Sequence, residues 1–291
     1  MEKAKVYFTK DISKESLVKV YEALDVNLKG KVAVKLHSGE EGNQNYLKPE
    51  FVKDLILHVG GTVVECNTAY EGKRNTTEKH EKLMNDHGWS KYFEVDILDS
   101  EADMVLENSN GEIIKKNYVG EKMKNYDSML VLSHFKGHPM GGFGGAIKNI
   151  SIGLASSKGK GYIHSGGMEN ASFEEIMNAD HDNFLKSMAD SAKTITDYYK
   201  DNIVYINVMV NLSRDCDCCH VAEDPCMEDI GILASKDPVS LDQACLDLIY
   251  NSSDPGKDMF IERVESRNGL LTILSSVEQG VGSRDYELIL L

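Results

Sequence analysis

The sequence contains no run of about 20 uninterrupted apolar residues, the length that a membrane-spanning helix requires. Its first residues, MEKAKVYFTKDISKES, lack the apolar core of a secretory signal. We therefore expect a cytoplasmic protein without a membrane segment. Proline is also scarce, with 5 residues among 291, while 41% of the chain is hydrophobic. This composition excludes collagen-like and disordered chains.

Basic residues are also fewer than acidic ones. The chain has 32 Lys and Arg residues against 47 Asp and Glu, which gives a net charge of −15. No basic run with interleaved aromatic residues is present, so nucleic acid is not an expected partner. The cytoplasm keeps thiols reduced, so the six cysteines are not expected to form structural disulfides. Clustered cysteines in that compartment indicate metal or redox chemistry.

Short apolar runs alternate with amphipathic stretches, a pattern typical of α/β proteins. Residues 31–36 and 62–66 predict two strands around a helix that begins at Pro49 and ends at Gly60-Gly61, which together form a βαβ unit. We expect an open, mostly parallel mixed sheet flanked by helices, with inserted loops. The whole chain, 1–291, is expected to form one α/β domain, with weak subdivisions near residues 125 and 200.

Other elements follow from local signals. A hairpin over 103–119 is predicted with a type I′ turn at Asn110-Gly111. One long helix is expected to begin at a capping box of Ser172 and Glu175 and to reach Ile195. Another helix is expected to begin at Asp237-Pro238. Further strands are predicted at residues 93–97, 128–132, 203–210 and 230–234.

A glycine-rich stretch, residues 133–149, directly follows a predicted strand. Ligands bind at the carboxyl ends of strands in open α/β sheets, and glycine lets the backbone approach an anion closely. The stretch matches neither of the common nucleotide-binding patterns. We expect catalysis to involve His134, His138 and Lys148. Ligand or cofactor binding in this stretch is assigned to Lys136, Gly141, Gly142, Gly144, Gly145 and Asn149.

Four cysteines lie within residues 216–226. In an extended segment Cys216 and Cys218 point the same way while Cys219 points away. The predicted metal ligands are Cys216, Cys218, Cys219 and Cys226, with His220 as an alternative to Cys219. The spacing leaves iron–sulfur and zinc open. Cys66 and Cys245 lie in apolar runs and are expected to be core residues.

Two further segments carry candidate ligand-binding residues. The loop after strand 31–36 offers Lys35, His37 and Glu40 at a strand end. His164 lies in a second segment framed by glycines. Arg74 precedes a helix whose cap is Asn75 or Thr76, and we expect its side chain to be solvated.

The chain resembles the uncharacterised Fe–S centre protein family, also called domain of unknown function 362. The resemblance rests on residues 35–43 (KLHSGEEGN), 134–149 and 229–240 (DIGILASKDPVS), in that order. It implies an iron–sulfur cluster such as [4Fe–4S], with zinc as the alternative. Many relatives carry a ferredoxin-like insert with two four-cysteine runs, whereas this chain has the short loop 216–226.

A more distant resemblance is to the nickel-pincer lactate racemase family. There a lysine holds the cofactor and a histidine ligates nickel, and the similar positions here are His138, Lys148 and His164. A lysine, Lys73, stands where that family has an acid/base histidine. The predicted function is therefore metal or iron–sulfur binding, with redox or metal-centre chemistry and a small anionic ligand or a redox partner protein. The alternatives are an isomerase of hydroxy acids and a non-catalytic anion-binding module.

Overall fold

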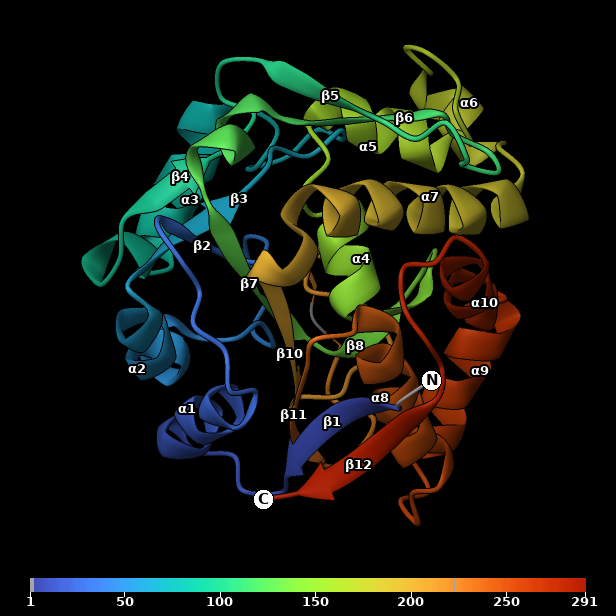
Figure 1. The fold of residues 1–291 in the computed structure, drawn as a ribbon. Coiled ribbons are helices and arrows are strands. Elements are labelled where there is room, and N and C mark those ends of the chain that lie inside the picture. Colours follow the sequence, from blue (N-terminus) through green and yellow to red (C-terminus); the bar gives the residue numbers. More distant parts are fainter. Residues whose placement is uncertain (1–2, 222) are drawn as a thin grey trace.

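The computed structural model describes residues 3–221 and 223–291. Its centre is an eight-stranded sheet in the order β12-β1-β11-β10-β7-β2-β3-β4 (Figure 1). β11 runs antiparallel to β1 and β10, and the other neighbouring pairs are parallel. This confirms the predicted α/β fold with a mixed, mostly parallel sheet. The strands are β1 Ala4–Thr9, β2 Val32–Lys35, β3 Gly61–Glu65, β4 Val95–Ile97, β7 Ser128–His134, β10 Ile203–Met209, β11 Gly231–Ser235 and β12 Tyr286–Leu290.

Helices cover both faces of this sheet. On one face lie α1 (Lys14–Ala23), α2 (Pro49–Val59) and α3 (Thr77–Asp86), and on the other α4 (Ala146–Ser151), α7 (His181–Tyr199) and α8 (Pro238–Tyr250) (Figure 1). α9 (Lys257–Ser266) and α10 (Leu270–Glu278) pack outside α8 and α7. Short 3-10 helices occur at Trp89–Lys91, Glu121–Asn125 and Lys200–Asn202.

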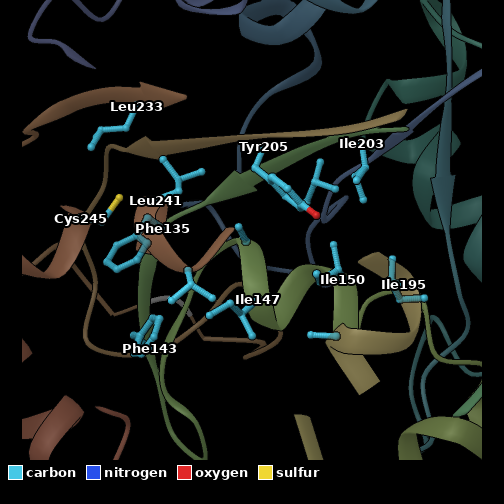
Figure 2. Packing of buried hydrophobic residues seen from close by; sticks show 14 of the residues in the cluster. Phe135, Phe143, Ile147, Ile150, Ile195, Ile203, Tyr205, Leu233, Leu241 and Cys245 are labelled. Atoms are coloured by element: carbon cyan, nitrogen blue, oxygen red, sulfur yellow. The ribbon is translucent and has the colours of Figure 1, made fainter. Parts of the chain in front are cut away.

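The two faces are supplied by alternate residues of the central strands. In β7, Met129 and Val131 join the core beneath α4 and α8, while Leu130 and Leu132 join the core beneath α1 and α2. Figure 2 shows the first of these cores, in which Tyr205 of β10 lies near Ile150 of α4. Both faces are buried, which explains why the strand sequences are nearly continuous apolar runs.

The predicted βαβ unit is confirmed, because β2 and β3, which precede and follow α2 along the chain, pair in parallel. Pro49 is the first residue of α2, and Gly60 ends the helix in the left-handed conformation with φ of +62°. The predicted start of α8 is also confirmed, because the Asp237 carboxylate accepts the N–H groups of Val239 and Ser240. Thr76 caps α3 through the N–H group of Lys79.

Two local predictions are wrong. The capping box at Ser172 exists, but its helix α6 covers only Phe173–Met177, and α7 begins separately after Asp180, whose carboxylate accepts the N–H of Asn183. The hairpin is present as β5 (Asp103–Glu107) and β6 (Lys116–Gly120). However, neither Asn110 nor Gly111 has the positive φ that a type I′ turn requires.

The glycine-rich stretch also contains regular structure. It forms a small hairpin of β8 (Lys136–His138) and β9 (Gly142–Gly144), followed by α4. α5 (Ser157–His164) and α6 come next along the chain. Within residues 3–221 and 223–291, none of the helices is both long and hydrophobic enough to cross a bilayer.

Candidate functional site

A cavity of about 230 Å³ opens at the carboxyl ends of the central parallel strands. Lys35 ends β2, Glu65 ends β3 and His134 ends β7, and all three line it. This is the edge where ligands bind in open α/β sheets. Of the residues predicted to bind a ligand or metal, those lining the cavity are Lys35, His37, His134, Lys136, His138, Gly144, Gly145, Lys148, Asn149, His164 and Cys218.

Basic side chains dominate the wall of this cavity. Five of them line it, although the protein carries a net charge of −15: Lys35, Arg74, Lys136, Lys148 and Lys160. Glu65 is the one carboxylate among the described lining residues. All of these cations except Lys148 are at most 8% exposed. Such a concentration of buried positive charge attracts anions strongly, because the surrounding protein screens it far less than water would.

Three of the five cations are paired with carboxylates. Lys35 Nζ lies 3.4 Å from Glu65, and Lys136 Nζ lies 2.9 Å from Asp217. Nε of Arg74 lies 3.1 Å from Oε2 of Glu40. Glu40 therefore holds a lining residue in place without lining the cavity itself. The expectation of a solvated Arg74 is wrong, since this side chain is buried between Glu40 and Tyr70.

The other two cations have no carboxylate partner within the described ranges. Lys160 Nζ donates to the carbonyl oxygen of Ala155 at 2.5 Å. Lys148 Nζ makes neither an ion pair nor a hydrogen bond to any described residue. Burial, with Lys136 as the next cause, lowers the pKa of Lys148 to about 7. Near neutral pH this side chain can therefore act as an ammonium that binds an anion, or as an amine.

The glycines of the stretch serve different purposes. Gly144 leaves room beside the cavity, because a Cβ there would lie 3.5 Å from Cδ of Lys148. Gly145 lines the cavity but is also packed closely, since a Cβ would lie 2.3 Å from the Asp242 carboxylate. Gly141 and Gly142 do not line the cavity. Gly142 begins β9 with a φ of +79° and packs against Gly269.

The cysteine-containing loop is anchored in the cavity wall by the residue between its first two cysteines. The buried Asp217 carboxylate lies 2.8 Å from Nδ1 of His134 and 2.9 Å from Nζ of Lys136. Its carbonyl oxygen accepts the N–H of Glu40 at 3.0 Å. His134 and Lys136 hold the pKa of Asp217 well below its usual value. The loop is thereby tied to both the glycine-rich stretch and the loop after β2.

His138, Cys216 and Cys218 form one group in which the potential ligand atoms lie within 4.8 Å of one another. Residues 216–219 form a turn, with the N–H of Cys219 donating to the carbonyl of Cys216, rather than the expected extended segment. Cys219 and Cys226 are not members of this group, and Cys226 Sγ instead contacts the carbonyl of Leu212.

The two grouped cysteines are joined as a disulfide. This differs from the expectation that the cysteines would not pair. The turn explains the difference, because it brings residues only two positions apart to a Cα–Cα distance of 5.3 Å. That separation lies within the range that disulfides span. Cys66 and Cys245 are buried core residues, as predicted.

His138 and His164 differ in the role of Nδ1, which accepts hydrogen bonds in His138 and donates one in His164. Nδ1 of His138 accepts the N–H groups of Gly141 and Met140 at 2.8 and 3.2 Å. Burial and Lys148 hold the pKa of His138 well below its usual value, so the neutral ring carries its proton on Nε2. His164 is the opposite case, because its Nδ1 donates to the carbonyl of Lys160 and leaves Nε2 as an acceptor.

His134 forms hydrogen bonds through both ring nitrogens, and His37 forms one through Nδ1. Both ring nitrogens of His134 face oxygen acceptors, the Asp217 carboxylate and the carbonyl of Val210 at 2.6 Å. His134 therefore orients Asp217 and has no free nitrogen for a ligand. His37 accepts the N–H of Gly39 at Nδ1, and burial, with Arg74 as the next cause, holds its pKa well below the usual range.

Sequence reasoning did not identify four residues that build the site: Glu65, Arg74, Lys160 and Asp217. Glu65 could have been found, because it is a charged residue at the end of a buried strand. Lys160 and Asp217 stand next to candidates that were identified, in a lysine–glycine segment and between two cysteines. Arg74 carries no local signal of burial.

Residues 32–247 match the family described as Domain of unknown function (DUF362). The chain belongs to the DUF362 family. Among solved structures, this DUF362 protein resembles the lactate racemase apoprotein from Thermoanaerobacterium thermosaccharolyticum, with 16% identity and a TM-score of 0.42 over 70% of this chain and 50% of that one. It also resembles a protein from Thermotoga maritima, with 12% identity and a TM-score of 0.46 over 88% of this chain and 58% of that one. The chain thus spans about half the length of these structures. No curated protein matches it significantly.

Proposed function

We propose that this DUF362 protein binds a small organic anion in the basic cavity, beside a metal ion held by His138, Cys216 and Cys218. The observation that carries the proposal is the convergence of five basic side chains on a cavity with one lining carboxylate. Pockets that bury drug-sized ligands usually measure about 300–1,000 Å³. The cavity, at about 230 Å³, suits a smaller molecule than that.

The charge balance favours an anion. Lys35, Arg74 and Lys136 are compensated by protein carboxylates, whereas Lys148 and Lys160 have no such partner among residues 3–221 and 223–291. Holding uncompensated positive charge inside a protein is unfavourable, and a bound anion relieves that cost. A phosphate or carboxylate group placed between these two ammonium groups accepts hydrogen bonds from both.

The donor set suits a single thiophilic ion such as zinc. Two thiolates and one imidazole are ligands that zinc prefers, and the fourth position is left for the anion or water. A [4Fe–4S] cluster takes four thiolates, and Cys219 and Cys226 lie outside the group. The ion would polarise an oxygen of the bound anion.

Two changes accompany entry of the ion. The disulfide must be reduced, because only thiolates ligate. His138 must also exchange its hydrogen-bond partners: Nδ1 gives up the N–H groups of Met140 and Gly141, either to ligate the ion itself or to take the proton from Nε2 so that Nε2 can ligate. A reducing cytoplasm suits the first requirement, and we therefore propose that location for the protein.

The test is thermal unfolding and calorimetry with sulfate, phosphate, acetate and lactate. A ligand at 100 times its Kd stabilises the folded state by about 2.7 kcal/mol. We expect at least one of these anions to bind the wild type, and Lys148→Met to bind it at least about tenfold more weakly. Lys124→Met, which alters an exposed lysine that does not line the cavity, should match the wild type. The absence of binding by every anion would refute the proposal.

The same samples separate binding from catalysis. Incubation with lactate in deuterated water shows whether the α-hydrogen exchanges with solvent. Exchange that depends on the cavity residues would favour the isomerase alternative, and binding without exchange would favour a function in anion binding alone.

A further inference from the structure

The cavity is lined by two kinds of surface. Five basic side chains line it, and the short helix α6 adds three apolar side chains, Phe173, Ile176 and Met177. Ile176 lies against α5, since its Cδ1 is 3.8 Å from the position that a Cβ on Gly161 would take. Met140 and Ile152 add apolar atoms from other elements. A ligand in this cavity can therefore contact both charged groups and hydrocarbon.

The side chains of α6 are exposed to an unusual degree for their size. Phe173 is 69% exposed and Met177 is 58% exposed. The helix itself is well defined locally, since Ser172 and Glu175 form a complete capping box. Its apolar side chains are thus presented at the cavity without burial, and covering them removes apolar surface from water.

We infer that the ligand of this site is an amphiphilic anion: a compact phosphate or carboxylate group joined to an apolar body of about the size of one aromatic ring. The anionic group lies between Lys148 and Lys160, and the apolar body lies against Phe173, Ile176 and Met177. This inference rests on the proposed anion-binding function and adds the chemical class of the ligand.

The polarity of the cavity decides against a purely polar anion. A ligand such as free phosphate contacts the basic side chains and leaves the α6 side chains in water. An aromatic ring that contacts the α6 side chains adds burial comparable to that of a large apolar side chain, which corresponds to about 10- to 100-fold in affinity. The limited volume excludes a long lipid chain from the cavity.

The experiment compares matched pairs of probes by calorimetry. Methyl phosphate and phenyl phosphate form one pair, and acetate and benzoate form the other. We expect the aromatic member of at least one pair to bind about 10- to 100-fold more tightly. The double variant Phe173→Ser, Met177→Ser should lose this preference and keep the wild-type Kd for the small member, since neither side chain is part of the packed core.

Leu57→Ser is the matched control, because Leu57 is 56% exposed on α2, on the other face of the sheet. It should keep the preference. Equal affinity for both members of each pair would overturn the inference while leaving the proposed function intact. Binding of no probe at all would overturn both. Sedimentation that showed dimers of the wild type and monomers of the double variant would also overturn it, because the α6 side chains would then cover a second copy of the chain.

Discussion

The carboxylate of Asp217 lies 2.9 Å from the ammonium group of Lys136. Asp217 separates the two grouped cysteines, and Lys136 belongs to the hairpin of the glycine-rich stretch. One buried ion pair therefore fixes the position of Cys216 and Cys218 relative to the basic cavity. The pair links the cysteine-containing loop to the basic cavity, and the proposed function depends on both. Removing the pair by mutation tests whether the loop is held by this contact.

Asp217→Asn should destabilise the protein by about 3–5 kcal/mol, because it leaves Lys136 without its buried partner. Chemical denaturation measures this loss. Asp224→Asn is the control, since Asp224 is an exposed carboxylate in the same loop, and its effect should stay within about 0.5 kcal/mol. Equal stability of the two variants would mean that the ion pair does not hold the loop.

The close packing of Gly145 leads to a second prediction. The Asp242 carboxylate accepts the N–H groups of Ala146 and Ile147 at the start of α4. Gly145→Ala forces this carboxylate to move and should cost about 1–3 kcal/mol in the free energy of unfolding. Gly144→Ala should cost less than about 1 kcal/mol, since its Cβ meets only ordinary contacts. Urea denaturation of both variants checks the difference, and a Gly144→Ala that was the less stable of the two would contradict it.

Local sequence signals predicted most of the sheet, because buried parallel strands are continuous apolar runs bounded by caps and glycines. They failed where a contact from elsewhere in the chain decides the structure. The loop after β5 is held by the Asp190 carboxylate of α7, which accepts the N–H groups of Glu112, Ile113 and Ile114. Asn110-Gly111 could not reveal that partner. The split between α6 and α7 was missed for another reason, since the apolar periodicity continues across the break at Asp180.

The candidate site was predictable to a similar degree. The glycine-rich stretch placed Lys136, His138 and Lys148 at a strand end, and the cavity contains all three. Arg74 could not be placed, because its burial depends on Glu40, 34 residues away along the chain. The cysteine spacing identified Cys216 and Cys218 as neighbours, although through a turn instead of an extended segment.

Metal binding should require reduction of the Cys216–Cys218 disulfide. We expect the reduced protein to bind one equivalent of zinc, measured by competition with a chromophoric chelator, and the oxidised protein to bind none. Cys216→Ser and Cys218→Ser should each abolish this stoichiometric binding, because each removes one of three ligands. Cys226→Ser should retain it, since Cys226 lies outside the group. Loss of zinc in the Cys226 variant would instead indicate a four-cysteine centre.

Anion affinity should fall as the pH rises through about 7. The pKa of Lys148 is lowered to about 7, mainly by burial and next by Lys136, so its ammonium form is complete below that pH and is lost above it. Sulfate is a suitable probe because it does not titrate in this range. Its Kd should increase about tenfold between pH 6 and pH 8.5, and calorimetry at pH 8 in buffers of different ionisation enthalpy should reveal proton uptake on binding.

His138 and His164 stay neutral over this range, because burial lowers the pKa of each, to about 4 for His164. Lys148→Met should bind sulfate weakly at every pH and without proton uptake, and a variant that kept the wild-type pH dependence would show that another group titrates.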